Sequence, residues 1–166
     1  LEVSRKKTGS LFRLACFSAA QLATNDEQHE IAMRHFGESI GLAFQVVDDI
    51  LDVLGSAAEL GKSPGTDIRE RKPSIVNLLW LESGSPLANE LLLQRSDAKP
   101  ASADEINAAL TELKGSPTLE QAYEIAREFA NKARSALESS RQRLAQSNSA
   151  FDTLEALVDF VLERMN

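Results

Sequence analysis

The chain has 166 residues, of which 43% are apolar and only 5% aromatic, enough for the core of one domain. Its net charge of −7 excludes nucleic acid as an expected partner, because phosphate backbones are bound by clustered Lys and Arg. The single Cys16 excludes an internal disulfide framework and is expected to be a small buried side chain, and no apolar run could span a bilayer.

Apolar residues recur at helical spacing throughout, which predicts an all-α protein with a single domain over residues 1–166. The second helix should begin under a Thr24 or Asn25 cap, and the sixth under Ser116-Pro117. We expect helices over about residues 8–24, 26–54, 74–82, 86–94, 102–114 and 116–145, and a final helix that follows residues 147–149 and carries Phe151 to Leu162. Between residues 55 and 73, frequent Gly and Pro predict a loop with at most a short helical turn.

The second expected helix has a narrow polar sector. On a helical wheel with Asp48 at zero, Asp52 falls near 40°, Gln45 near 60° and Gly41 near 20°. Apolar residues surround this sector: Phe44 and Leu51 border it, and Val46, Ile50 and Val53 lie opposite. A helix that is apolar nearly all round is buried, so the acidic sector should open onto a cavity rather than general solvent.

Two carboxylates at this spacing favour a metal ion. Asp48 and Asp52 lie about 5–6 Å apart at Cβ and, both ionised, repel by roughly 3 kcal/mol at an effective dielectric near 20. No Lys or Arg occurs between Arg34 and Lys62 to offset this repulsion. Mg²⁺ fits, because it takes one or two carboxylates together with phosphate oxygens. Asp49, near 100° on the wheel, should contribute less, and Gly41 should leave room for a ligand.

Lysines stand where a phosphate ligand would need them. Lys7-Thr8 lies at the start of the first helix, where backbone N–H groups and the helix dipole favour anions. The segment 61–67, GKSPGTD, can fold Lys62 and backbone donors around an anion. Each lysine alone is weak evidence, but their order around the carboxylates strengthens the prediction of a metal–phosphate site.

These segments resemble the motifs of the trans-isoprenyl (polyprenyl) diphosphate synthases. Residues 44–52, FQVVDDILD, are similar to the family's second aspartate-rich motif. Residues 7–12, KTGSLF, resemble its upstream K-T segment, and 61–67 followed by 72–74, KPS, resemble its GKxxGxD and K-x-[ST] segments. Val76 departs from the Pro of many members.

The resemblance implies an isoprenoid-synthase-type helical bundle, incomplete here. The family's first aspartate-rich motif would lie upstream, so we expect this chain to be the C-terminal half. The chain also opens on Leu1 rather than Met, which suggests a fragment. The isolated half should be inactive and incompletely covered. We expect a cytoplasmic protein. An organellar targeting peptide on the missing half is also compatible with the sequence.

The implied activity is prenyl transfer. An allylic diphosphate ionises with the help of Mg²⁺, isopentenyl diphosphate attacks the carbocation, and loss of a proton gives a longer trans-polyprenyl diphosphate. The active form is expected to be a homo-oligomer, a dimer by resemblance. The implied metal ligands are Asp48, Asp49 and Asp52. The implied catalytic and diphosphate-binding residues are Lys7, Thr8, Gln45, Lys62 and Lys72.

Two alternatives stay open. A non-catalytic subunit of a heteromeric synthase would have the same fold, but such subunits typically lose acidic-motif residues, and Asp48, Asp49 and Asp52 are intact. A class I terpene cyclase would also share the fold, but it usually has a second metal motif of Asn, Ser and Glu and lacks the lysine segments. A DDxxD-type motif upstream would favour the synthase.

Overall fold

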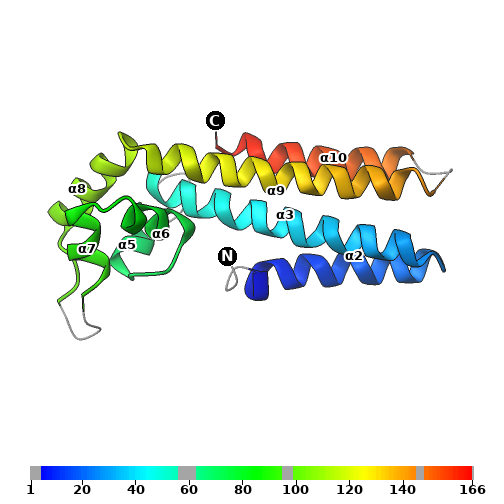
Figure 1. Ribbon diagram of the computed structural model, residues 1–166, viewed down its shortest axis with the longest axis horizontal. Helices are drawn as coiled ribbons and strands as arrows, with labels where there is room; N and C mark the ends of the chain where they lie inside the picture. Colours follow the sequence, from blue (N-terminus) through cyan, green and yellow to red (C-terminus); the bar gives the residue numbers. More distant parts are fainter. Residues whose placement is uncertain (1–4, 56–62, 95–98, 145–147, 166) are drawn as a thin grey trace. The chain divides into compact units, whose positions relative to one another are not determined.

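The computed structural model describes residues 5–55, 63–94, 99–144 and 148–165, and all regular secondary structure that these residues form is helical (Figure 1). The elements are a π-helical turn η1 (Arg5–Gly9) and the α-helices α2 (Ser10–Ala23), α3 (Glu27–Leu54), α5 (Thr66–Arg69), α6 (Ile75–Glu82), α7 (Pro86–Leu92), α8 (Ala103–Lys114), α9 (Pro117–Arg141) and α10 (Asn148–Glu163). The predicted all-α class is confirmed. Within the described ranges, no helix is both long and apolar enough to cross a membrane.

Two helices in the middle of the chain begin where the sequence predicts, at about residues 74 and 102. Ser74 accepts a hydrogen bond from the backbone amide of Asn77 at the start of α6. Ser102 and Glu105 form a capping box at the start of α8, each side chain accepting from the other residue's backbone amide. Because these signals are local, sequence alone located both helix starts.

Two predicted helix boundaries, the cap of α3 and the end of α9, were wrong, and so was the predicted full burial of Cys16. The side chain that caps α3 is Asp26, which accepts from the amides of Gln28 and His29 at 2.9 and 3.2 Å, rather than Thr24 or Asn25. Helix α9 ends at Arg141, short of residue 145, in a stretch without Gly or Pro to mark the stop. Cys16 is only partly buried, although this burial still raises the pKa of its thiol.

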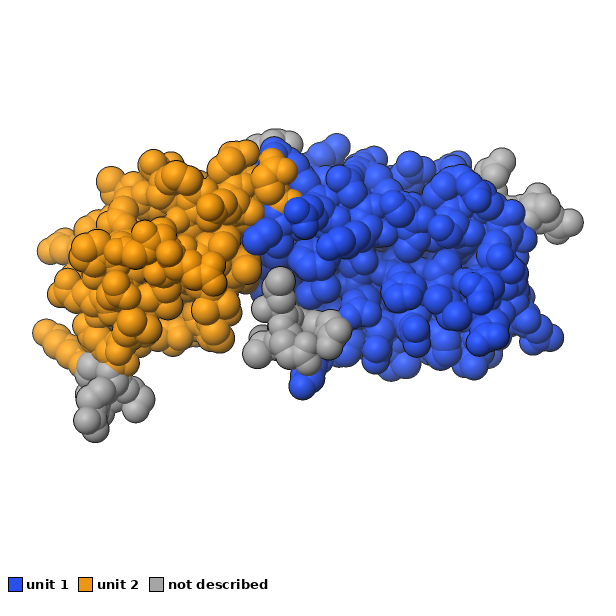
Figure 2. All heavy atoms as spheres, viewed as in Figure 1, with its two compact units in different colours: residues 1–47, 125–166 blue, residues 48–124 orange. Residues whose placement is uncertain are grey.

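The chain forms two compact units, residues 1–47 with 125–166 and residues 48–124 (Figure 2). The expectation of one domain over residues 1–166 stays a prediction. In the first unit, α2, most of α3, α9 and α10 run side by side (Figure 1). The buried ring of His29 on α3 lies 2.7 Å, Nδ1 to Oγ, from Ser140 on α9. Arg141 on α9 pairs with Asp152 and Glu155 on α10 at 2.9 and 3.2 Å.

The second unit contains the last turns of α3, the helices α5 to α8, and the start of α9. Its core includes Trp80 of α6, whose side chain is almost fully buried. The indole Nε1 of Trp80 donates to Glu112 Oε1 on α8 at 2.8 Å, and Ser85 Oγ donates to the same oxygen. This shared acceptor links α6 and the start of α7 to α8. These short helices share the second unit with the end of α3.

Candidate functional site

The acidic face of α3 holds carboxylates of different exposure. Asp48 is partly exposed, whereas Asp49 and Asp52 are only 6% and 1% exposed. The predicted apolar face opposite is confirmed by the buried side chains of Val46, Ile50 and Val53. Asp48 is therefore the carboxylate of the three that is most accessible to a ligand.

Asp52 fastens the following loop to the end of α3. Its backbone carbonyl accepts from the amide of Gly65 at 2.7 Å, and its Oδ2 accepts from the amide of Asp67 at 2.9 Å. Gly65 has φ +74°, and a Cβ there would lie 2.7 Å from Ile106 Cγ2 of α8. Only glycine fits both the left-handed backbone and this close approach. Gly65 of the GKSPGTD segment thus has a packing role.

Asp49 caps α6. Its Oδ2 accepts from the amide of Ile75, the first residue of α6, at 2.7 Å. A carboxylate at a helix N-terminus satisfies an otherwise unpaired amide and interacts favourably with the helix dipole. Asp49 and Ser74 together hold the start of α6 against the end of α3. This bond gives Asp49 a structural role, and its predicted share in metal binding stays a prediction.

Lys72 presents its ammonium group beside two acidic side chains. Its Nζ lies 2.8 Å from Glu70 Oε2 and 3.2 Å from Asp67 Oδ1. The hydrogen bond with Glu70, and then that with Asp67, raises the pKa of Lys72 above its ordinary value, against the opposing effect of desolvation. The ammonium is therefore charged at neutral pH. Because its side chain is 48% exposed, an anion can reach it.

In the first unit, the structure brings Thr8 and Gln45 together. Thr8 Oγ1 in η1 donates to Gln45 Oε1 on α3 at 2.9 Å. Lys7 lies in the same π-helical turn, which begins at Arg5 and leads into α2, and its side chain lies outside the described part of the chain. Lys62 lies entirely outside the described residues.

The prediction that Gly41 leaves room for a ligand is wrong. A Cβ at Gly41 would lie 2.9 Å from Gly9 Cα and 3.2 Å from Phe12 Cβ, so the start of α2 fills this space. One turn earlier, a Cβ at Gly37 would lie 2.5 Å from the carbonyl oxygen of Phe12. The two glycines allow α2 and α3 to approach closely, a partner that the sequence of α3 alone does not reveal.

Phe44, at the start of the aspartate-rich segment, is partly exposed and has aromatic and cationic neighbours in the first unit. Its ring centroid lies 6.0 Å from that of Phe12, and the guanidinium carbon of Arg164 lies 5.0 Å from it. Arg164 Nη1 is buried and has no hydrogen-bond partner in the part of the chain that the structure describes. Sequence reasoning did not single out Arg164, since no motif surrounds it near the end of α10.

The carboxylates of α3 could bind a metal ion only if a ligand such as a diphosphate supplied further oxygens. Among the described residues, no three His, Cys, Asp or Glu side chains are arranged to bind an ion by themselves. Mg²⁺ characteristically takes one or two carboxylates and completes its octahedron with water and phosphate oxygens. A part-exposed Asp48 beside two carboxylates fixed by backbone amides suits that chemistry better than it suits a cage of protein ligands.

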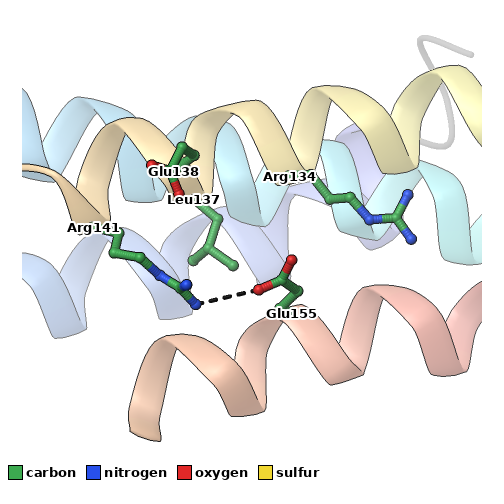
Figure 3. Close-up of a pocket in the computed structure, with 5 residues that line it drawn as sticks. All are labelled: Arg134, Leu137, Glu138, Arg141 and Glu155. Carbon is green, nitrogen blue, oxygen red and sulfur yellow. Dashed lines mark hydrogen bonds and ion pairs between the residues drawn. The ribbon is translucent and has the colours of Figure 1, made fainter. Parts of the chain in front are cut away.

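A hollow in the first unit is not this site. It lies between α9 and α10, and the close-up shows Arg141 reaching Glu155 beneath Leu137 (Figure 3). Its other labelled residues are Arg134 and Glu138. Arg134 also pairs with an acid of α10, Asp159, so these charges fasten one helix to the other. No residue of the predicted motifs lines this hollow.

Comparisons with a family model and with individual proteins point to the same family. The model of the polyprenyl synthetase family matches residues 1–113. Octaprenyl diphosphate synthase of Haemophilus influenzae is 35% identical over 140 residues, which are 83% of this chain and 42% of that protein. Nonaprenyl diphosphate synthase of Mycobacterium tuberculosis is 36% identical over 171 residues, 99% of this chain and 47% of that protein.

Solved structures agree with the sequence relatives. A crystal structure of a polyprenyl synthase from Caulobacter crescentus, complexed with calcium and isoprenyl diphosphate, has a TM-score of 0.84 at 30% identity. The match covers 99% of this chain and 49% of that one. The chain thus spans about half the length of the proteins it matches.

Proposed function

The chain belongs to the polyprenyl synthetase family, and from this premise we propose that it supplies part of the diphosphate and magnesium site of a prenyltransferase. The enzyme would condense an allylic diphosphate with isopentenyl diphosphate to give a longer trans-polyprenyl diphosphate. The observation that supports this most is the arrangement in the second unit. There a part-exposed Asp48, two amide-bound carboxylates and an accessible Lys72 occur within residues 48–72.

In this proposal each group in the second unit has a distinct role. Asp48, with Asp49 and Asp52 beside it, would hold Mg²⁺ against the diphosphate. The metal would supply Lewis-acid stabilisation of the leaving diphosphate. Lys72 would neutralise a phosphate oxygen by exchanging its contacts with acidic side chains for a contact with the ligand. Lys62, from the adjoining segment, is proposed to act in the same way.

The first unit would contribute hydrogen bonds and an apolar wall. Lys7 and Thr8 lie in η1, the helical turn that leads into α2, and would bind phosphate oxygens there. The bond from Thr8 to Gln45 holds the Gln45 amide in place before a ligand arrives. Phe44 borders the polar sector of α3 and would exclude water from the reacting carbons, and the part-buried Leu51 of the second unit is proposed to act in the same way.

The alternatives have less support. The intact Asp48, Asp49 and Asp52 do not favour a non-catalytic subunit. The relatives described above are named as prenyl diphosphate synthases rather than cyclases. A cyclase usually also lacks the lysine segments, whereas Lys7, Lys62 and Lys72 are all present here.

The test uses the complete natural polypeptide that contains residues 1–166. It would be incubated with Mg²⁺ and farnesyl diphosphate, with and without isopentenyl diphosphate, beside its Asp48→Ala variant. Prenyl transfer predicts a longer diphosphate product only when both substrates and Mg²⁺ are present, and a large loss in the variant. A hydrocarbon formed from farnesyl diphosphate alone would favour the cyclase. No product without an added partner protein would favour the non-catalytic subunit.

A further inference from the structure

Asn77 of α6 lies in the second unit and is 2% exposed, although its side chain is a polar amide. Its Nδ2 donates two hydrogen bonds, to the carbonyl of Asp67 at 3.1 Å and to the carbonyl of Lys72 at 2.9 Å. Since both partners are acceptors, the NH₂ group must face them and the orientation of the amide is determined. One buried side chain therefore holds both ends of the segment 67–72.

The segment between these carbonyls is a tight turn with an unusual backbone. The amide of Lys72 donates to the carbonyl of Asp67 at 2.9 Å, which closes the turn. Arg71, just before Lys72, has φ +51°, in the left-handed region that non-glycine residues rarely adopt. Such a conformation persists only where surrounding contacts hold it. The amide of Asn77 is such a contact, because it bonds the residue on the far side of Arg71.

Both ends of the turn lead to the proposed ligand site. Lys72 presents its ammonium from one end, and Asp67 donates its backbone amide to Asp52 Oδ2 from the other. Movement of the turn would therefore displace a cation and the group that orients a carboxylate at the same time. A change in the geometry of the turn should therefore weaken ligand binding.

We propose that Asn77 is a positioning residue that sets the placement of Lys72 and Asp52 toward a magnesium–diphosphate ligand. It acts through the turn and touches no substrate. This inference rests on the proposed function, which supplies the ligand. It goes beyond the resemblance of the motifs, because Asn77 belongs to none of the segments that carry the resemblance.

The experiment measures binding of inorganic diphosphate with Mg²⁺ by calorimetry, using the complete natural polypeptide. Asn77→Ala removes both bonds without adding charge, and Asn89→Ala, at an exposed asparagine of α7, is the matched control. Asn77→Ser, which keeps one hydroxyl donor, is the milder variant if Asn77→Ala does not fold. We expect about tenfold weaker binding in Asn77→Ala, as for the loss of one to two net hydrogen bonds, and no change in the control.

A double-mutant cycle separates positioning from simple stabilisation. If Asn77 acts through Lys72, then Asn77→Ala should have a smaller effect in a Lys72→Ala background than in the wild type. A lower melting temperature with unchanged affinity, or fully additive effects, would overturn the role of Asn77 and leave the proposed function standing. A wild type that binds no magnesium–diphosphate would instead contradict the proposed function. In that case the role of Asn77 in holding the turn can be tested by hydrogen exchange. The Lys72 amide should exchange slowly in the wild type and rapidly in Asn77→Ala.

Discussion

The side chain of Asp52 and the backbone amide of Asp67 meet at 2.9 Å, so a residue of the aspartate-rich segment binds the segment that follows it. The carbonyl of Asp52 also accepts from Gly65. Asp49 forms the equivalent link to Ile75 at the start of α6. Asp49 and Asp52 thus hold the segments that follow α3, whereas Asp48 is the more accessible carboxylate. Substitution of Asp49 or Asp52 should therefore change both stability and ligand binding.

The first prediction separates these roles by comparing Asp49→Ala with Asp48→Ala. Loss of the Asp49 carboxylate leaves the amide of Ile75 without its acceptor and should lower the free energy of unfolding by about 1–2 kcal/mol. Asp48 is partly exposed, so its replacement should leave stability nearly unchanged but weaken magnesium–diphosphate binding. Urea unfolding and calorimetry on the same samples measure both effects. Equal stability losses in the two variants would contradict this division.

The sequence predicted what local signals determine. The helix starts at Ser74 and Ser102, and the buried face of α3, follow from capping residues and spacing, and all are found. The function of Gly41 could not be predicted, because it depends on Gly9, which lies far away along the chain. The link between Asp49 and Ile75 was missed for the same reason, since helical wheels place residues on one helix and reveal no partner from another.

The second prediction concerns Gly65, with Gly84 as its matched control. Both have positive φ, +74° and +76°, but a Cβ at Gly84 would meet nothing within 4 Å, whereas one at Gly65 would clash with Ile106. Alanine at either position should cost roughly 1–2 kcal/mol for the left-handed backbone. Gly65→Ala should cost an additional 1–3 kcal/mol or so for overpacking. Urea unfolding measures the difference, and Ile106→Ala should reduce it. Equal losses at the two glycines would show that the contact with Ile106 is unimportant.

The third prediction concerns the lysines of the proposed anion site. Neutral replacement of Lys7, Lys62 or Lys72 should each lower the turnover rate roughly ten- to a hundredfold, because a charge-assisted contact to phosphate contributes about 1.5–3 kcal/mol. Lys114→Ala at the end of α8 is the control, since it lies outside every motif. Steady-state kinetics with saturating isopentenyl diphosphate is the measurement. If Lys72→Ala behaves like Lys114→Ala, the assignment of Lys72 is wrong.

The fourth prediction is an acid-dependent loss of stability at the start of α3. Arg143, which donates to Asp26 Oδ2 at 2.8 Å, is the main cause that holds the pKa of Asp26 below its ordinary value of 3.8. A carboxyl whose folded pKa is depressed stabilises the fold above its unfolded pKa and loses that contribution as pH falls through the folded pKa. Thermal unfolding between about pH 6 and 2.5 should therefore show a smaller decline below pH 4 in Asp26→Asn than in the wild type. Parallel curves would mean that the pair is not formed in solution.

The last prediction concerns the uncovered face of α2. Leu11, Leu14 and Leu22 are 67%, 59% and 89% exposed, and their spacing places them along one side of the helix. A row of exposed leucines of this kind is seldom left in water, and the chain spans only about half of the relatives it matches, so we expect a further segment or a second copy to cover it. Residues 1–166 alone should therefore self-associate or bind a hydrophobic dye, and should show no prenyl transfer. Replacing the three leucines by serine should reduce dye binding while leaving helix content unchanged, because none of them is in the core. A compact, dye-silent monomer by light scattering at micromolar concentration, or prenyl transfer by this chain alone, would contradict the prediction.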